Sequence, residues 1–559
     1  MQTTKTRDRS IVNIGTLHQG LQRMPGVLKR LGYSNLRQGQ DDIVYNVMGQ
    51  RDTIGFLPTA TGKSATFIVP ALCLDWKVLV FSPLVALMQD QVQSLWRRDI
   101  KAGQLSGTQS DNENRDVLQR WVRGELQFLY IAPERMKNQD FMAAITKLSP
   151  DLIVVDEAHS IAQWGTNFRP QYAKIGGLVK LLDPKVILAI TATATADVEQ
   201  EIRSVLHIES AFRISYMPER TNLKLSSSNF VSEAETVDRI KEANGPSIVY
   251  CATKTEVESL CASLDRHLPG KVTRYHGGLS DSEKKYNQAR FMEDVCSVCV
   301  ATNAFGMGID KPNIRGVFHY DHPGTVEALT QEVGRAGRDG LDSTCHTFYR
   351  AASKNTHRFF ADNGYPDERT IRSLHKLITD SANAAGHDYV EMSMKDMSFK
   401  AGMGSHGEMK VGAAISIMIR NGVLERPKSE DKIAKIRFKQ AAQSDDRMSK
   451  YWNIVEQFGS GNDNGFIEIS MDLLSTKIGL SAATVRNHFK AAQVENLLDF
   501  IPPFKGTPTY VKGPVDVINF PELKQRYREA LKKIDDVVLY INTPDKDKHT
   551  YLRDYFADK

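Results

Sequence analysis

The first residues that could do chemistry form a loop of the kind that cradles phosphates. The segment FLPTATGKSATF (56–67) follows a short apolar run and precedes a stretch of helical character. In that setting, backbone N–H groups and the N-terminus of the next helix face a bound anion. Lys63 is then predicted to neutralise the β- and γ-phosphates, and Ser64 to ligate Mg²⁺. The match is partial, because the general pattern has glycine where Leu57 stands, and GKS alone also arises by chance.

Two adjacent carboxylates end an apolar run in LIVVDEAHS (152–160). Asp156 is expected at the carboxyl end of a strand, where it could reach Mg²⁺, and Glu157 could orient and deprotonate an attacking water. The alternative is a strand followed by a solvated acidic turn. The presence of GKS about 90 residues earlier favours the metal and water roles over that alternative.

A third cluster is QEVGRAGRDG (331–340), in which Arg335 and Arg338 are three residues apart. If this stretch is helical, both arginines share one face. An arginine from a second domain can stabilise the γ-phosphate only when the two domains close, which would tie hydrolysis to domain movement. Standing alone, the segment would be interpreted as a basic surface turn.

These motifs need elements that position them, and two series of β-rich runs provide them. The runs alternate with stretches of helical length, which predicts α/β domains with parallel sheets covered by helices on both faces. The first series predicts a nucleotide-binding domain at 21–207, after a polar tail at 1–20, and the second predicts a domain at 208–350. The runs are VLVFS (78–82), FLYIA (128–132), LIVVD (152–156), VILAIT (186–191), SIVYCA (247–252), VTRYH (272–276), SVCVAT (297–302) and GVFHY (316–320).

The rest of the chain is predicted to be mainly helical, with one accessory region at 351–450 and another at 451–559. Each contains a helix, an apolar exit and a possible β wing, the wings being 432–439 and 507–512. In the second region a helix could end at Gly479 and the next could be capped by Ser481, which is a helix-turn-helix signal. An ordinary helical hairpin fits the pattern equally well. The C-terminal helix has no functional interpretation.

Composition limits the class of protein without naming a partner. The 559 residues carry a net charge of 72 − 67 = +5, which permits a polyanionic partner but does not require one. The sequence has no apolar run of about 18 residues and no secretory h-region, so no membrane contact is expected. Six cysteines are too few for a disulfide framework and predict buried thiols in a reducing cytoplasm.

Taken together, the ordered motifs resemble those of superfamily two helicases, and most closely the RecQ family of DNA helicases, over about residues 25–350. The resemblance implies two tandem RecA-like domains, followed by a winged-helix-like region, and the use of ATP with Mg²⁺. It implies that Gln40 contacts adenine with Arg37 nearby, and that Thr302 contacts DNA. By the same resemblance, the remaining nucleotide-binding residues are Thr59, Thr61, Gly62 and Asp310, and Gln331 joins the catalytic residues. The DNA-backbone motifs include Ser82 and Pro83, and Thr191 and Thr193 couple hydrolysis to movement.

The segment HSIAQWGTNFRPQY (159–172) resembles the aromatic-rich loop of the RecQ family. Trp164 and Phe168 could stack on unpaired bases, at about 1–3 kcal/mol per base, and Arg169 could add a phosphate or cation–π contact. Because the loop follows the two acids directly, DNA binding could report to Glu157 through His159. In isolation, these aromatic residues would be assigned to the core.

Three departures from the family pattern stand out. Ala60 replaces the usual glycine of the phosphate loop, and Thr166–Asn167 replaces the usual His-Asp of the aromatic loop. Cys345 is the last cysteine, so the four-cysteine zinc site of many RecQ proteins cannot form after the second domain. The one CxxC, at Cys296 and Cys299, lies in a strand and is interpreted as structural.

The leading hypothesis is an ATP-dependent 3′-to-5′ DNA helicase of RecQ type acting in DNA repair or recombination. Its partners would be single-stranded and forked duplex DNA, and its location the cytoplasm, or the nucleoid of a bacterium. In a winged-helix interpretation, five cations of the tail could contact duplex DNA, although a solvated face is an equal alternative: Lys410, Arg420, Lys435, Arg437 and Lys439. Other functions left open are a DNA-dependent translocase that remodels complexes without unwinding, a non-catalytic DNA-binding scaffold with a decayed motor, and an RNA helicase.

Overall fold

The structure is a computed structural model. It describes residues 9–557 except 10, 59–60, 84, 108, 162–171, 193–195, 217–218, 231, 307–310, 405–406, 427–432, 444, 462–464 and 502–507. The chain forms two compact units, one comprising Met1–His357 with Lys532–Lys559 and the other Arg358–Leu531. Among the described residues, no helix combines the length and apolar character needed to cross a bilayer.

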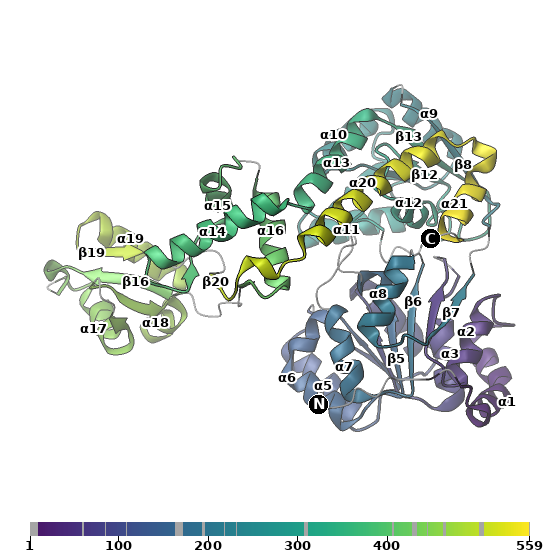
Figure 1. The fold of residues 1–559 in the computed structure, drawn as a ribbon, viewed down its shortest axis with the longest axis horizontal. Coiled ribbons are helices and arrows are strands. Elements are labelled where there is room, and N and C mark those ends of the chain that lie inside the picture. The colour runs from purple at the N-terminus through teal and green to yellow at the C-terminus, as the bar shows by residue number, and fades with distance from the viewer. Residues whose placement is uncertain are drawn as a thin grey trace. The chain divides into compact units, whose positions relative to one another are not determined.

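The first lobe of the larger unit is built on a parallel sheet flanked by helices (Figure 1). The strand order of this sheet is β3-β4-β2-β5-β6-β1-β7. Its strands are β1 (Thr53–Phe56), β2 (Val78–Phe81), β3 (Ala102–Leu105), β4 (Phe128–Ile131), β5 (Leu152–Asp156), β6 (Val186–Thr191) and β7 (Phe212–Ser215). Its helices are α1 (Ile14–Leu31), α2 (Gln40–Met48), α3 (Ala65–Leu74), α4 (Val85–Trp96), α5 (Asp111–Val122), α6 (Gln139–Lys147), α7 (Ile175–Leu182) and α8 (Ala196–Leu206).

Alternate residues of each central strand pack against opposite layers of helices. Val78 and Val80 of β2 join a core with α1–α4, whereas Leu79 and Phe81 join a core with α5–α8. Both faces of the sheet are therefore buried, which explains why the strands are continuous apolar runs.

The second lobe has a parallel sheet of its own, ordered β10-β11-β9-β12-β13-β8. Two tandem parallel α/β domains are thus confirmed. Because β7 pairs with β1, the chain leaves the first sheet after Ser215, beyond the predicted boundary at 207. The elements are β8 (Leu223–Asn229), α9 (Glu233–Ala243), β9 (Ser247–Tyr250), α10 (Lys254–His267), β10 (Val272–Tyr275), α11 (Asp281–Met292), β11 (Val298–Ala301), β12 (Gly316–His319), α12 (Val326–Val333) and β13 (Ser343–Tyr349).

The last two helices of the chain, α20 (Phe520–Asn542) and α21 (Lys548–Ala557), return to this second lobe. Val326 and Leu329 of α12 form a buried cluster with residues of both helices. Glu327 of α12 pairs with Lys533 at 3.1 Å and accepts a hydrogen bond from the Tyr555 hydroxyl at 3.3 Å. The C-terminal helices therefore complete the core around α12, a role that the sequence did not indicate.

The smaller unit contains the accessory modules, and their wings are exchanged relative to the prediction. The strand predicted as the first wing, β16, pairs with β18 and β19 of the second module, whereas β20, predicted as the second wing, pairs with β14 and β15 of the first. The second module is therefore inserted between two strands of the first. The elements from 351 are α13 (Ala351–Gly364), α14 (Glu368–Ala384), β14 (Tyr389–Val390), α15 (Met394–Lys400), α16 (Glu408–Arg420), β15 (Leu424–Glu425), β16 (Ile433–Phe438), α17 (Ser449–Phe458), β17 (Ser460–Gly461), β18 (Ile467–Ser470), α18 (Met471–Ile478), α19 (Ala482–Val494), β19 (Leu498–Ile501) and β20 (Thr509–Val511).

The predicted helix-turn-helix is present in the inserted module. Helix α18 ends at Gly479, whose φ of 75° is left-handed, and Ser481 caps α19 by accepting from the Thr484 N–H. The cap and the glycine thus act as the sequence predicts.

Candidate active site

The phosphate loop follows β1 and leads into α3 at the carboxyl edge of the first sheet. Gly62 has a φ of 74°, in the left-handed region that glycine adopts without strain. The Thr61 hydroxyl donates to the Pro58 carbonyl at 2.8 Å, which closes the turn. Ser64 stands at the start of α3 without using its side chain as a cap. Thr59 and Ala60 lie outside the described residues.

Gln40 fastens this loop to α2. Its side-chain amide donates to the carbonyls of Thr61 at 2.5 Å and Gly62 at 3.0 Å, and its oxygen accepts from the Arg37 N–H at 2.8 Å. Gln40 is buried, and Arg37 is exposed beside it. The structure therefore places both predicted nucleotide contacts next to the loop, with Gln40 bound to the loop's own backbone.

The acid pair lies opposite the loop. Asp156 is the last residue of β5, and Glu157 follows with a φ of 49°, a strained backbone for a residue with a side chain. The Lys63 ammonium is 3.2 Å from Glu157 Oε1. The GKS and DEAH motifs, which the sequence predicts to form one site, are thus joined by a direct ion pair.

The two carboxyls differ in their electrostatics. Burial, with the charge of Glu157, raises the pKa of Asp156 to about 6. Burial also acts to raise the pKa of Glu157, but the charges of Lys63 and His159 outweigh it and hold that pKa below its ordinary value. Glu157 is therefore the carboxylate kept ionised, as a residue that accepts a proton from water requires.

The residues predicted to hold Mg²⁺ fit that ion. Ser64 and Asp156 offer hard oxygen ligands, and the raised pKa of Asp156 marks a buried carboxylate that a nearby cation would stabilise. Over the part of the chain that the structure describes, no group of three or more His, Cys, Asp or Glu side chains could hold a metal by itself.

His159 links Glu157 to β6. Its Nδ1 lies 2.9 Å from the Thr191 hydroxyl and 3.4 Å from Glu157 Oε2, and burial lowers its pKa. Thr191 is fully buried at the end of β6. The predicted coupling residues His159 and Thr191 are thus in contact, whereas Thr193 lies outside the described residues.

The aromatic loop is described only at its ends. Trp164, Phe168 and Arg169 lie outside the described residues. At the far end, the buried Tyr172 donates from its hydroxyl to the Asp156 carbonyl at 3.2 Å. Sequence reasoning missed Tyr172 as a functional candidate, although it closes the segment that was singled out.

The arginine segment is not helical, contrary to one expectation. Helix α12 ends at Val333, and the segment 334–339 forms turns, so Arg335 and Arg338 do not share a helical face. Arg335 is buried and donates to the Gly306 carbonyl, while Arg338 is partly exposed. The charge of Arg335 helps to lower the pKa of Glu157. Gln331 stands in the last turn of α12.

The residues predicted to contact DNA lie at strand ends, but their side chains are covered. Ser82 and Pro83 follow β2 and are buried, and the N–H of Ser82 donates to the Ile131 carbonyl. Thr302 follows β11 and is 8 % exposed. Asp310, which was predicted for the nucleotide site and not for DNA, lies outside the described residues. A DNA contact at these positions stays a prediction, and at Ser82 it would fall to the backbone.

Three of the five tail cations face acids across their own sheet. Lys435 pairs with Glu468 at 3.0 Å, and Arg437 and Lys439 pair with Asp499 at 2.7 and 3.3 Å. This neutralisation favours the solvated-face interpretation for β16.

Five of the six cysteines are buried free thiols, as predicted, whereas Cys261 is partly exposed. Cys296 and Cys299 are buried in the second lobe, and burial raises the pKa of both. Cys345 is buried as well, with a pKa raised to about 12. Their positions in the core support a structural role for the CxxC pair.

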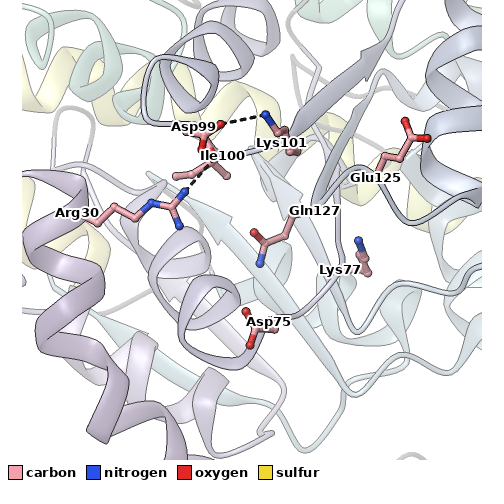
Figure 2. A pocket seen from close by; sticks show the side chains of 8 residues that line it. All are labelled: Arg30, Asp75, Lys77, Asp99, Ile100, Lys101, Glu125 and Gln127. Carbon is pink, nitrogen blue, oxygen red and sulfur yellow. Dashed lines mark hydrogen bonds and ion pairs between the residues drawn. The ribbon is translucent and has the colours of Figure 1, made fainter.

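A polar pocket of the first lobe lies at the other edge of the sheet (Figure 2). Lys77 precedes β2 and Lys101 precedes β3, so the pocket is at the amino ends of the strands. Lys77 Nζ donates to the Gly124 and Leu126 carbonyls, and Lys101 pairs with Asp99 at 2.9 Å. Ligands of open α/β sheets bind at the carboxyl ends, so we assign this pocket a structural role.

A phosphate loop and an acid pair lie on one parallel α/β lobe, and a second such lobe carries arginines, which is the arrangement that the resemblance to superfamily two helicases implies. The family models agree: "DEAD/DEAH box helicase" matches residues 37–202 and "Helicase conserved C-terminal domain" matches residues 232–340. The curated proteins that the chain matches include ATP-dependent DNA helicases of RecQ type, to which it is 34–39% identical.

Three relatives illustrate the similarity. "Probable ATP-dependent DNA helicase RecS" of Bacillus subtilis is 39% identical over 317 residues, covering 56% of this chain and 64% of that protein. "ATP-dependent DNA helicase RecQ" of the same organism is 38% identical, covering 62% and 59%. "ATP-dependent helicase wrn-1" of Caenorhabditis elegans is 34% identical, covering 62% and 34%. The chain thus spans less than two thirds of the length of each of these relatives.

Proposed function

We propose that this chain is an ATP-dependent DNA helicase that moves 3′ to 5′ along single-stranded DNA and unwinds duplex or forked DNA in repair or recombination. ATP would be its fuel and Mg²⁺ its metal, with no zinc. The direction and the choice of DNA rest on the similarity to the RecQ-type relatives. A location inside the cell follows from the need for both ATP and DNA.

The observation that carries the proposal is the contact between Lys63 and Glu157, 3.2 Å apart at the carboxyl edge of the first sheet. A loop lysine and an ionised glutamate brought together at this edge suit one reaction class, the attack of water on a γ-phosphate. Lys63 would neutralise phosphate charge, Glu157 would accept the proton of the water, and Arg335 and Arg338 would complete the site when the lobes close.

DNA binding would be sensed through the aromatic loop. The loop begins beside His159 and ends at Tyr172, and these residues contact Glu157 and the Asp156 carbonyl respectively. Bases stacked on Trp164 and Phe168 would therefore act on a segment attached at both ends to the acid pair.

The test is ATP hydrolysis with and without single-stranded DNA, followed by strand displacement on duplexes with 3′ or 5′ tails. The expected result is DNA-stimulated hydrolysis and displacement of the 3′-tailed duplex only. Glu157→Gln should lower the turnover number by about 100-fold or more while leaving ATP binding intact. Hydrolysis that survives this substitution would contradict the assignment, and a single-stranded RNA of matched sequence tests the choice of nucleic acid.

A second candidate is a DNA-dependent translocase that does not unwind. It is favoured by the absence of cysteine after Cys345, since the zinc module of many RecQ proteins cannot form. Stimulated hydrolysis with removal of a protein roadblock, but without strand displacement on any tail, would support this candidate over the helicase. Absence of hydrolysis under all conditions would leave the non-catalytic scaffold.

A further inference from the structure

A single arginine outside every motif holds the backbone of the arginine segment. Arg220 donates from one guanidinium nitrogen to the Gly334 carbonyl at 2.9 Å, and from the other to the Ala336 and Gly337 carbonyls at 2.7 Å each. Three carbonyls within four residues thus converge on one planar cation. Asn222 adds a fourth contact, from its side-chain amide to the Gly337 carbonyl at 2.9 Å.

The arginine segment has lost the regular hydrogen bonding of a helix. Helix α12 ends at Val333, and the backbone continues in turns, in which the Gly337 carbonyl also accepts from the Gly340 N–H at 3.1 Å. A guanidinium presents five N–H groups in a fixed fork and carries the positive charge that a helix C-terminus favours. Arg220 therefore fixes the path of the segment that carries Arg335 and Arg338.

Arg220 also belongs to the linker between the two lobes. The linker runs from β7, which pairs with β1 of the first sheet, to β8, which pairs with β13 of the second (Figure 1). At its start, the Tyr216 N–H donates to the carbonyl of Phe56, the residue where β1 ends before the phosphate loop. The linker is thus hydrogen-bonded at Tyr216 to the end of β1, just before the phosphate loop, and at Arg220 to the arginine segment.

We propose that Arg220 is a positioning residue for hydrolysis, which holds residues 334–337 so that Arg335 and Arg338 meet the γ-phosphate when the lobes close. The inference rests on the proposed function. It predicts that Arg220 matters little for binding the ground-state nucleotide and much for stabilising the transition state, because a displacement of about 1 Å in a catalytic group can cost about 100-fold in rate.

The experiment compares Arg220→Gln and Arg220→Lys with the unaltered chain. Arg220→Gln should lower the DNA-stimulated kcat by about 10- to 100-fold and change the KM for ATP by less than about 3-fold. Affinity for ADP with aluminium fluoride, which mimics the transferring phosphoryl group, should fall by a similar factor, whereas affinity for ADP alone should not. Arg220→Lys should recover only part of the loss, because a compact ammonium lacks the fixed planar spread of N–H groups with which the guanidinium reaches its three carbonyls.

Arg239→Gln is the matched control. Arg239 lies on α9 of the same lobe and pairs with Glu235 of its own helix at 2.9 Å, so its loss should leave kcat unchanged. Equal turnover in Arg220→Gln and the unaltered chain would overturn the proposal, and so would parallel losses of ADP and ADP–aluminium fluoride binding. If Arg220→Gln does not fold, Asn222→Ala takes its place, with an expected selective loss of about 3- to 10-fold and the same criteria. Failure of the proposed function would be distinct, because the unaltered chain would then lack DNA-stimulated hydrolysis.

Discussion

Replacing Asp156 by Asn is expected to stabilise the nucleotide-free protein while removing its ability to hydrolyse ATP. Burial, with the charge of Glu157, raises the pKa of the Asp156 carboxyl from its ordinary 3.8 to about 6. The folded chain therefore holds this proton more tightly than the unfolded chain, and ionising the group costs folding free energy. At ~1.36 kcal/mol per pH unit, the difference corresponds to about 3 kcal/mol above pH 6.

The cost at Asp156 changes with pH in one direction. Below pH 3.8 the carboxyl is protonated in both states, so the cost is absent; it grows as the pH rises toward 6 and is then constant. Asn cannot ionise and avoids the cost at every pH. The gain from Asp156→Asn should therefore be full at pH 8 and about half as large at pH 5.

Thermal unfolding without nucleotide or Mg²⁺ measures this gain. For a lobe of about 200 residues, 3 kcal/mol corresponds to a rise in Tm of roughly 6–12 °C. Asp116→Asn, at an exposed position of α5, removes the same charge without touching the acid pair and serves as the control. An unchanged or lower Tm for Asp156→Asn at pH 8, or a gain of equal size at both pH values, would refute the electrostatic reasoning.

Two substitutions test other contacts of the site, and a third experiment tests the zinc-free prediction. Thr191→Val removes the hydroxyl that lies 2.9 Å from His159 Nδ1. It should reduce DNA stimulation of kcat by about 10-fold at a similar KM for ATP. Stimulation equal to that of the unaltered chain in a titration with single-stranded DNA would argue against this coupling. Tyr172→Phe removes the hydrogen bond to the Asp156 carbonyl and should lower stability by about 0.5–1.5 kcal/mol in chemical denaturation, with weaker DNA stimulation at an unchanged basal rate; a loss of basal rate instead would assign Tyr172 to the chemistry. Treatment with a strong zinc chelator should leave Tm unchanged, and one zinc per chain by elemental analysis would contradict the zinc-free prediction.

The sequence predicted most of the central strands because burial on both faces makes them continuous apolar runs. Strands β3, β7, β8 and β13 were not foreseen. The first three stand at sheet edges, whereas β13 lies between β12 and β8 but carries Ser343, Thr344 and Thr347 in place of a continuous apolar run. An edge strand is covered less completely and carries polar residues, as the exposed and half-exposed side chains of β7 show, so its pattern does not separate it from a loop.

Strand pairing in the tail was beyond the sequence for a different reason. A β-rich run indicates that a strand exists but not which strand it joins, and nearness in the chain suggested that each wing follows its own helices. The insertion of one module between β15 and β20 breaks that expectation, since β20 returns to β15 after the whole inserted module. Only the three-dimensional arrangement shows which wing belongs to which module.

The candidate site was predictable where chemistry fixes residue types, and not where it depends on backbone acceptors. Lys63, Asp156 and Glu157 are marked by spacing and by the strands before them. Arg220 and Tyr172 donate hydrogen bonds to backbone carbonyl groups of other segments. Every residue has a backbone carbonyl, so the sequence does not show which one a side chain will contact. Their one signal was position, between the two sheets for Arg220 and at the end of the aromatic segment for Tyr172.

The acid pair has two features that destabilise a fold, and the contacts that compensate for them also matter for the proposed function. Two like charges are adjacent and largely buried, and Glu157 is held in the left-handed region; such features persist only where the surroundings compensate them. Lys63 supplies compensation through its ion pair with Glu157, yet the same ammonium is the group that the proposed function assigns to phosphate. A triphosphate arriving at the loop would therefore compete with Glu157 for Lys63. Once Lys63 turns to phosphate, Glu157 would keep its contact with His159, which also contacts Thr191 on β6. His159 begins the aromatic loop that is proposed to sense DNA, so this loop would then control the glutamate that meets water.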